Sequence, residues 1–154
     1  MKTEKVIKKY KYEGLGVPVV IMNAPFKKAF GEWFLDIDLN KLQKEVLNAL
    51  VHKTSLLTGN ELRFIRKYFE MTTTEFGDLL GVTHPAVLKW EKGKSQIPAA
   101  TEKYVRLYAY DQMKAKNNEF RKFFYELSNE SLYRNQSKSE KPFRIDAADM
   151  SIAA

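Results

Sequence analysis

The chain of 154 residues contains no cysteine and only two histidines. Without thiols it can form neither disulfide bonds nor thiolate metal sites, and such a composition is typical of the reducing cytoplasm. The histidines, His52 and His84, lie in different segments and lack the spacing of metal ligands. We therefore expect a cytoplasmic protein that binds no metal and no cofactor.

Long hydrophobic runs are missing as well. No stretch approaches the roughly 20 apolar residues that a membrane helix needs, and the basic N-terminal residues are not followed by the apolar segment of a secretory signal. The chain also lacks a P-loop, a dinucleotide-binding glycine motif, a metal-binding helix motif and the nucleophile elbow of hydrolases. We expect neither a membrane protein nor an enzyme.

What the chain does have is positive charge, with a formal net charge of +7. This excess suits a polyanionic partner such as DNA. Residues 1–28 carry seven lysines against two glutamates, whereas residues 58–94 carry six basic and five acidic side chains. The basic arm either attracts such a partner over a distance or is an ordinary solvated surface, and the two interpretations carry equal weight.

Aromatic and β-branched residues at 10–13 and 17–22 flank three residues that include two glycines. This pattern predicts a β-hairpin, and residues 30–37 are a candidate third strand. Pro18 cannot donate a ladder hydrogen bond, so we expect the second strand to lie at a sheet edge or to be bulged there.

Helical patterns follow from Asp38, which is placed to cap a helix that runs to about Lys53 with one apolar face. Packing of that face within the chain is favoured over packing on a second subunit. Asp36 and Asp38 resemble a catalytic carboxylate pair, but a strand-end residue followed by a helix cap is the favoured interpretation. After Pro98 the pattern predicts one long helix over residues 99–127, followed by a polar, loose tail.

Residues 57–93 hold two short helical patterns joined by a tight turn. Thr72 and Glu75 have the spacing of a capping box, and Gly81 is expected to end the first helix with a positive φ. Thr83 is expected to cap the second helix, with Pro85 in its first turn. This is the order of a helix-turn-helix, in which the second helix lies in the major groove of DNA.

The start of that second helix indicates which side chains would contact DNA. His84 and Lys89 can hydrogen-bond base edges, whereas Pro85 and Ala86 offer only apolar contact, for instance to a thymine methyl group. Threonines at the start of the first helix and lysines after the second are placed for phosphates. The predicted DNA-contacting residues are Thr72, Thr73, Thr83, His84, Pro85, Ala86, Lys89, Lys92 and Lys94.

Residues 57–94 resemble the Xre/phage-repressor helix-turn-helix family in the capped helix, the Gly-Val-Thr turn and the Trp-Glu-x-Gly ending. The resemblance implies an internal ion pair between Arg66 and Glu91. It also places Thr73 where the family has a phosphate-contacting glutamine, and Pro85 where it often has a polar base-contacting residue. The expected structural residues of the motif are Arg66, Gly81, Trp90, Glu91 and Gly93.

A wider stretch, about residues 10–110, is similar to MqsA-type antitoxins and related regulators. It shares with them a Tyr-x-Tyr start, an apolar strand, a helix and the Leu-Thr-Gly-x-Glu-Leu-Arg run. Antitoxins of that type carry a cysteine zinc site in the N-terminal domain, and this chain has no cysteine. The resemblance implies autorepression of a toxin–antitoxin operon and a toxin protein as partner.

From these patterns we predict a mainly α fold, an Xre-type helix-turn-helix bundle with a small N-terminal β-hairpin unit and a long C-terminal helix. The predicted segments are a hairpin unit (1–37), the DNA-binding domain (38–112), a helical extension (113–127) and a polar, flexible tail (128–154).

The predicted function is a sequence-specific transcriptional regulator, a repressor that binds double-stranded operator DNA as a homodimer. One set of residues on the long, aromatic-rich helix is either the dimer face or part of the core, namely Tyr104, Leu107, Tyr108 and Tyr110. The alternative is a protein-binding module, toxin-neutralising or scaffolding, that acts through the hairpin or residues 120–125. The near-neutral helix-turn-helix and the apolar Pro85 and Ala86 favour that alternative.

Overall fold

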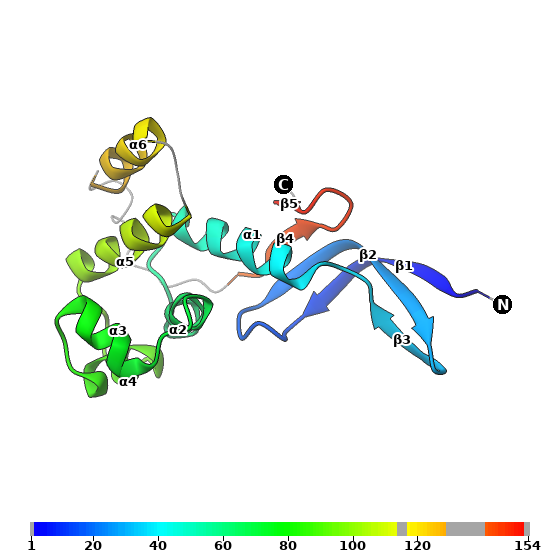
Figure 1. Ribbon diagram of the computed structural model, residues 1–154, viewed down its shortest axis with the longest axis horizontal. Coiled ribbons are helices and arrows are strands. Elements are labelled where there is room, and N and C mark those ends of the chain that lie inside the picture. Colours follow the sequence, from blue (N-terminus) through cyan, green and yellow to red (C-terminus); the bar gives the residue numbers. More distant parts are fainter. Residues whose placement is uncertain (1, 114–116, 129–140, 153–154) are drawn as a thin grey trace. The chain divides into compact units, whose positions relative to one another are not determined.

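The computed structural model describes residues 2–113, 117–128 and 141–152 (Figure 1). The chain divides into two compact units: Met1–Ala49 together with Glu140–Ala154 form unit 1, and Leu50–Ser139 form unit 2. In sequence, unit 2 is therefore inserted between the two segments that build unit 1.

Unit 1 begins with three consecutive antiparallel strands. β1 (Glu4–Tyr12) and β2 (Val19–Ala29) form an antiparallel hairpin, and β3 (Glu32–Leu35) folds back onto the second half of β2. The β2–β3 turn contains Phe30 and Gly31, both with positive φ, as a type I′ hairpin turn requires. The predicted hairpin is thus present and longer than expected, and the candidate third strand forms.

The C-terminal segment adds two more strands. β4 (Phe143–Asp146) runs parallel to the first half of β2, and β5 (Ser151–Ile152) pairs antiparallel with β4. Across the described ranges this gives a five-stranded sheet in the order β1-β2-β4-β5, with β3 also on β2. The sequence analysis expected a loose tail here. The strand forms because Ile145 is wholly buried in unit 1, while residues 129–140 of the expected tail lie outside the described part.

Pro18 does not mark a sheet edge, because β2 has partners on both sides. It lies just before β2, where its carbonyl accepts a hydrogen bond from the backbone N–H of Phe143 (3.2 Å). The proline inside the strand, Pro25, sits between the half that pairs with β4 and the half that pairs with β3. The expectation of an edge strand was wrong, because Pro18 lies outside β2 and β2 is paired on both sides.

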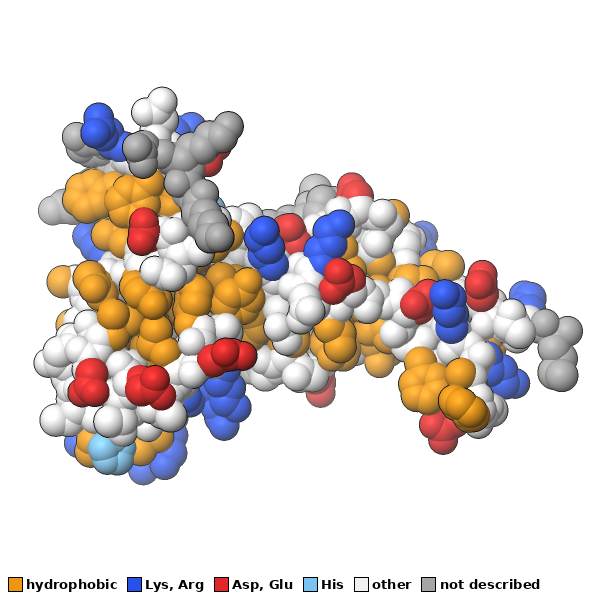
Figure 2. Space-filling view, viewed as in Figure 1, with side chains coloured by type: hydrophobic (Ala, Val, Ile, Leu, Met, Phe, Trp, Pro, Cys, Tyr) orange, Lys and Arg blue, Asp and Glu red, His pale blue; other side chains and the backbone are white. Residues whose placement is uncertain are grey.

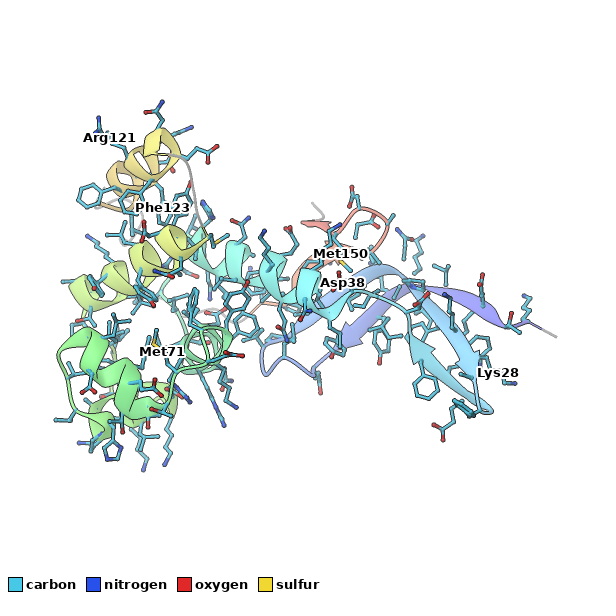
Figure 3. All side chains as sticks on the ribbon, viewed as in Figure 1. Lys28, Asp38, Met71, Arg121, Phe123 and Met150 are labelled. Carbon is cyan, nitrogen blue, oxygen red and sulfur yellow. The ribbon has the colours of Figure 1, made fainter. Side chains whose placement is uncertain are left out.

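α1 (Leu39–Val51) follows directly on the sheet in the chain. Asp38 caps it as predicted, because its carboxylate accepts a hydrogen bond from the backbone N–H of Lys41 (3.2 Å); Figure 3 labels Asp38 at the start of this helix. Asp36 instead pairs with Lys27 (3.0 Å) and raises the pKa of that lysine. Both carboxylates thus have structural partners.

Unit 2 is helical. Its elements are α2 (Gly59–Tyr68), α3 (Thr73–Leu80), α4 (His84–Glu91), α5 (Ala99–Gln112) and α6 (Asn117–Ser128). The single long helix predicted over residues 99–127 was wrong, because the region forms two helices. Phe123 points from α6 towards α5 (Figure 3), and its ring stacks on Tyr110 with centroids 4.5 Å apart. Burial raises the pKa of the Tyr110 hydroxyl.

A buried arginine fixes the segment that precedes α2. Arg106 on α5 is 1% exposed and donates to the backbone carbonyls of Val51 (3.4 Å), Lys53 and Ser55 (2.7 Å). It also binds one carboxylate oxygen of Glu102 (2.7 and 3.0 Å), whose other oxygen accepts from the Leu57 N–H (3.3 Å). These hydrogen bonds from Arg106 and to Glu102 hold residues 51–57 against α5.

The predicted mainly α fold was wrong, because the protein is mixed α/β. Helices make up 47% and strands 22% of the described structure, and the sheet is a major part of unit 1 rather than a small hairpin. Its extent was missed because β4 is short and its partner strand lies far away in the sequence. No helix in the described ranges is both long and apolar enough to cross a membrane.

The role of β4 can be tested by truncating Ile145. Ile145→Ala should lower the free energy of unfolding of unit 1 by about 2–5 kcal/mol, because it removes buried methylene groups and leaves a cavity. Hydrogen exchange at the amides of β2 would measure the loss. Arg144→Ala, at an exposed position of the same strand, should change it by less than about 0.5 kcal/mol. Equal β2 protection in both variants would contradict this assignment.

Candidate nucleic-acid interface

α2 and α3, the two helices that precede the turn into α4, each begin with a complete capping box. At α3 the Glu75 N–H donates to the Thr72 hydroxyl oxygen (3.1 Å), and the Thr72 N–H donates to the Glu75 carboxylate (3.3 Å). This confirms the cap predicted for α3. The same reciprocal pair, Thr58 with Glu61, begins α2. Each box satisfies two N–H groups that a helix start leaves unpaired.

The turn between α3 and α4 is fixed by two glycines. Gly81 ends α3 in the left-handed region (φ 71°), as predicted. Gly77, inside α3, lies so close to the turn that a β-carbon there would be 2.7 Å from the Val82 carbonyl oxygen. The Val82 N–H in turn donates to the Gly77 carbonyl (2.9 Å). The backbone of the turn before α4 therefore packs directly against the backbone of α3 at Gly77.

α4 begins and ends where the sequence indicated. Thr83 occupies the N-cap position with extended backbone, although its hydroxyl makes no capping bond. Pro85 is the second residue of the helix, where the missing N–H has no helical partner to lose. After the helix, Gly93 takes a positive φ (73°), and the Lys94 N–H returns to the Lys89 carbonyl (2.9 Å).

One side of α4 is buried and the other faces solvent. Val87 is wholly buried and Trp90 is 7% exposed, so both anchor the helix in the unit. Most of the predicted DNA-contacting residues are exposed. Those exposed are Thr72, Thr83, His84, Pro85, Lys89, Lys92 and Lys94, whereas Thr73 and Ala86 are half-buried. They belong to α4, the residues that flank it and the start of α3.

An ion pair holds α4 to the two helices before it. Arg66 on α2 donates to both carboxylate oxygens of Glu91 (2.8 and 2.9 Å), and also to the carbonyl of Met71 (2.9 Å). Met71 lies between α2 and α3 (Figure 3). The fork geometry of arginine suits this bidentate contact. The pair that the resemblance implied is thus present, and it joins three segments of the motif.

Two glycines of the site were missed by the sequence analysis. Gly59 begins α2, and a β-carbon there would lie 2.3 Å from the Glu91 carbonyl oxygen and 2.7 Å from that of Trp90. Gly77 makes the equivalent close contact with the turn. A signal existed for Gly77, because a glycine inside a helix costs stability and indicates close packing. Nothing in the sequence distinguishes Gly59 from an ordinary first-turn residue.

The aromatic residues proposed for a dimer face have different surroundings. The Tyr108 ring packs against Phe69 with centroids 5.5 Å apart, and Tyr110 stacks on α6. Tyr104, by contrast, is 48% exposed. The intramolecular alternative therefore describes Tyr108 and Tyr110, which are half-buried like Leu107, whereas Tyr104 is the exposed member of the predicted set.

No protein-family model, curated protein or solved structure matches this chain. Among the described residues, no three or more His, Asp or Glu side chains are grouped so that they could hold a metal ion.

The Arg66–Glu91 pair makes a testable contribution to stability. Arg66→Gln should destabilise unit 2 by about 3 kcal/mol, because it leaves the Glu91 carboxylate, whose side chain is 5% exposed, without its cation. Urea denaturation followed by helical circular dichroism would measure this. Arg63→Gln, at an exposed position of the same helix, should leave the midpoint almost unchanged. A similar midpoint for both variants would show that the pair has no structural role.

Proposed function

We propose that this chain is a sequence-specific DNA-binding transcriptional regulator that acts as a repressor. The observation that carries the proposal is the exposed side of α4, which presents His84 and Lys89 on a helix held from behind by three contacts. Those contacts are the buried Trp90, the Arg66–Glu91 pair and the close approach at Gly77. A rigidly held helix with exposed polar side chains at its start suits insertion into a major groove.

Within that groove the residues would take different roles. Lys89 can donate to guanine O6 and N7, and His84 can donate or accept at a base edge. Pro85 and the half-buried Ala86 can offer only apolar contact, which suits a thymine methyl group. Base specificity therefore rests chiefly on two side chains.

Phosphate contacts would set the register of the helix on the duplex. Thr72 and Thr73 lie at the start of α3, where free N–H groups and the helix dipole favour an anion. Lys92 and Lys94 follow α4 on an exposed turn. With Thr83, they would contact the backbone on either side of the base-contacting residues.

The operator complex is proposed to contain a homodimer, since two-fold symmetric proteins read paired half-sites about one helical turn apart. Tyr104 supports a dimer contact on α5, because it is an exposed aromatic residue there. The resemblance to antitoxin-type regulators supports autorepression of a toxin–antitoxin operon in the cytoplasm, with a toxin as the protein partner.

A second candidate function, protein binding through unit 1, is favoured by a different observation. Phe30 at the β2–β3 turn is fully exposed, Phe34 is 49% exposed and Val6 is 66% exposed. Phe34 lies opposite Lys27, and Val6 lies opposite Pro25, on the neighbouring strand. Apolar side chains gathered at one end of a sheet are typical of a surface that a partner covers.

The DNA-binding proposal can be tested with Lys89→Ala. It should weaken binding to the preferred duplex by about 1–3 kcal/mol and relax selection at one base position, because a direct base contact is lost. Selection from random-sequence duplexes, followed by fluorescence anisotropy, would measure both effects. Lys122→Ala removes an equal charge from α6, where the side chain is 79% exposed, and should alter neither.

Two results would refute the proposal. One is a selection that enriches no sequence. The other is an enriched duplex that the wild-type protein binds no more tightly than random DNA, with Lys89→Ala causing no loss. Binding of an unrelated protein through Phe30 and Phe34, in the absence of any DNA preference, would favour the second candidate instead.

A further inference from the structure

We propose that α2 supplies a second row of phosphate contacts, made by Arg63 and Lys67, beside the lysines that follow α4. This deepens the proposed DNA-binding function and rests on it. None of the predicted contact residues lies on α2, so the interface would be wider than the helix-turn-helix alone.

α2 is held in a fixed position beside the end of α4. Arg66 is joined to Glu91 by two hydrogen bonds, and Gly59 lies against the carbonyl oxygens of Trp90 and Glu91. On an α-helix, residues seven apart point in nearly the same direction. The side of α2 that carries Gly59 and Arg66 therefore faces the last turn of α4.

The two exposed basic residues of α2 lie on the same side of that helix. At about 100° per residue, Arg63 lies roughly 60° and Lys67 roughly 100° around the helix from Arg66, both in the same sense. Leu62 and Ile65 lie in the opposite sense and are buried. Arg63 and Lys67 thus occupy the solvent edge of the contact between α2 and α4, and both are exposed.

Three of the acidic residues in this segment have partners within the protein. By count, residues 58–94 are almost neutral, but two of the five acidic side chains are turned inwards. Glu61 is wholly buried and pairs with Lys53 (2.5 Å), and Glu91 is occupied by Arg66. Glu75, though exposed, is engaged in the cap of α3.

The basic group proposed to contact phosphates consists of the five exposed basic side chains of residues 58–94, a segment in which three acidic side chains, Glu70, Glu75 and Asp78, are also exposed. Its members are Arg63, Lys67, Lys89, Lys92 and Lys94. Figure 2 shows Lys and Arg side chains beneath α2 as well as at the end of this unit where α4 lies, with acidic side chains higher on the same unit. A basic strip that begins at the base-contacting helix and continues onto α2 fits the phosphate backbone flanking a groove, and arginine suits phosphate through its planar fork.

The test compares two double variants with the same loss of charge. In Arg63→Gln/Lys67→Gln the slope of log affinity against log salt should become shallower by about 2, because each lost phosphate contact removes about 0.9. The deficit relative to wild type should then be about tenfold larger at 50 mM than at 200 mM salt. It should be equal for the selected duplex and for random duplex, since phosphates carry no base identity.

The matched control is Lys41→Gln/Lys44→Gln, which removes two exposed charges from α1. It should leave the slope unchanged. An unchanged slope in the α2 variant, with wild-type sequence preference and a loss in Lys89→Ala, would overturn this inference alone. An equal reduction in both double variants would also overturn it, because net charge would then be the cause. Absence of any sequence preference in the wild type would overturn the proposed function itself.

Discussion

The buried guanidinium of Arg106 is the constraint on which the arrangement of unit 2 depends. It holds the carbonyls of the segment before α2, while Glu102 holds the N–H of Leu57. A buried ion pair stabilises little unless its remaining hydrogen bonds are satisfied, and here the surrounding backbone satisfies them. Because α2 starts immediately after this segment, and Arg66 then fixes α4, one polar cluster on α5 sets the position of the proposed DNA-contacting helix.

Formal charge is a poor guide to the surface of this unit. The helix-turn-helix segment is almost neutral by count, and that count favoured a protein-binding role. Three of its five acidic side chains, however, are used for a buried pair, a bidentate contact and a helix cap, while Glu70 and Asp78 are exposed. Glu61 and Glu91 are turned inwards, each beside a cationic partner. Five exposed basic side chains in this segment therefore outnumber the three exposed acidic ones.

Features encoded within a few residues were predictable. The capping box at Thr72, the positive φ of Gly81, the start of α1 after Asp38 and the Arg66–Glu91 pair all follow from short-range patterns or from the resemblance. The division of the aromatic helix into α5 and α6 was missed because neither glycine nor proline marks it. Strand β4 was missed because its four residues acquire a partner only from β2, and close contacts such as Gly59 against Glu91 depend on three-dimensional packing.

The parallel pairing of β2 with β4 has a consequence for biosynthesis. Asn23 and Asp146, which are hydrogen-bonded to each other, are 123 positions apart. Since a chain leaves the ribosome from its N-terminus and domains generally fold as units, all of unit 2 is made before β4 exists. During that interval Val19–Met22 of β2 lack the strand that pairs with them on that side. The inserted unit is therefore synthesised first, and β4 can join the sheet only after residues 143–146 have been translated.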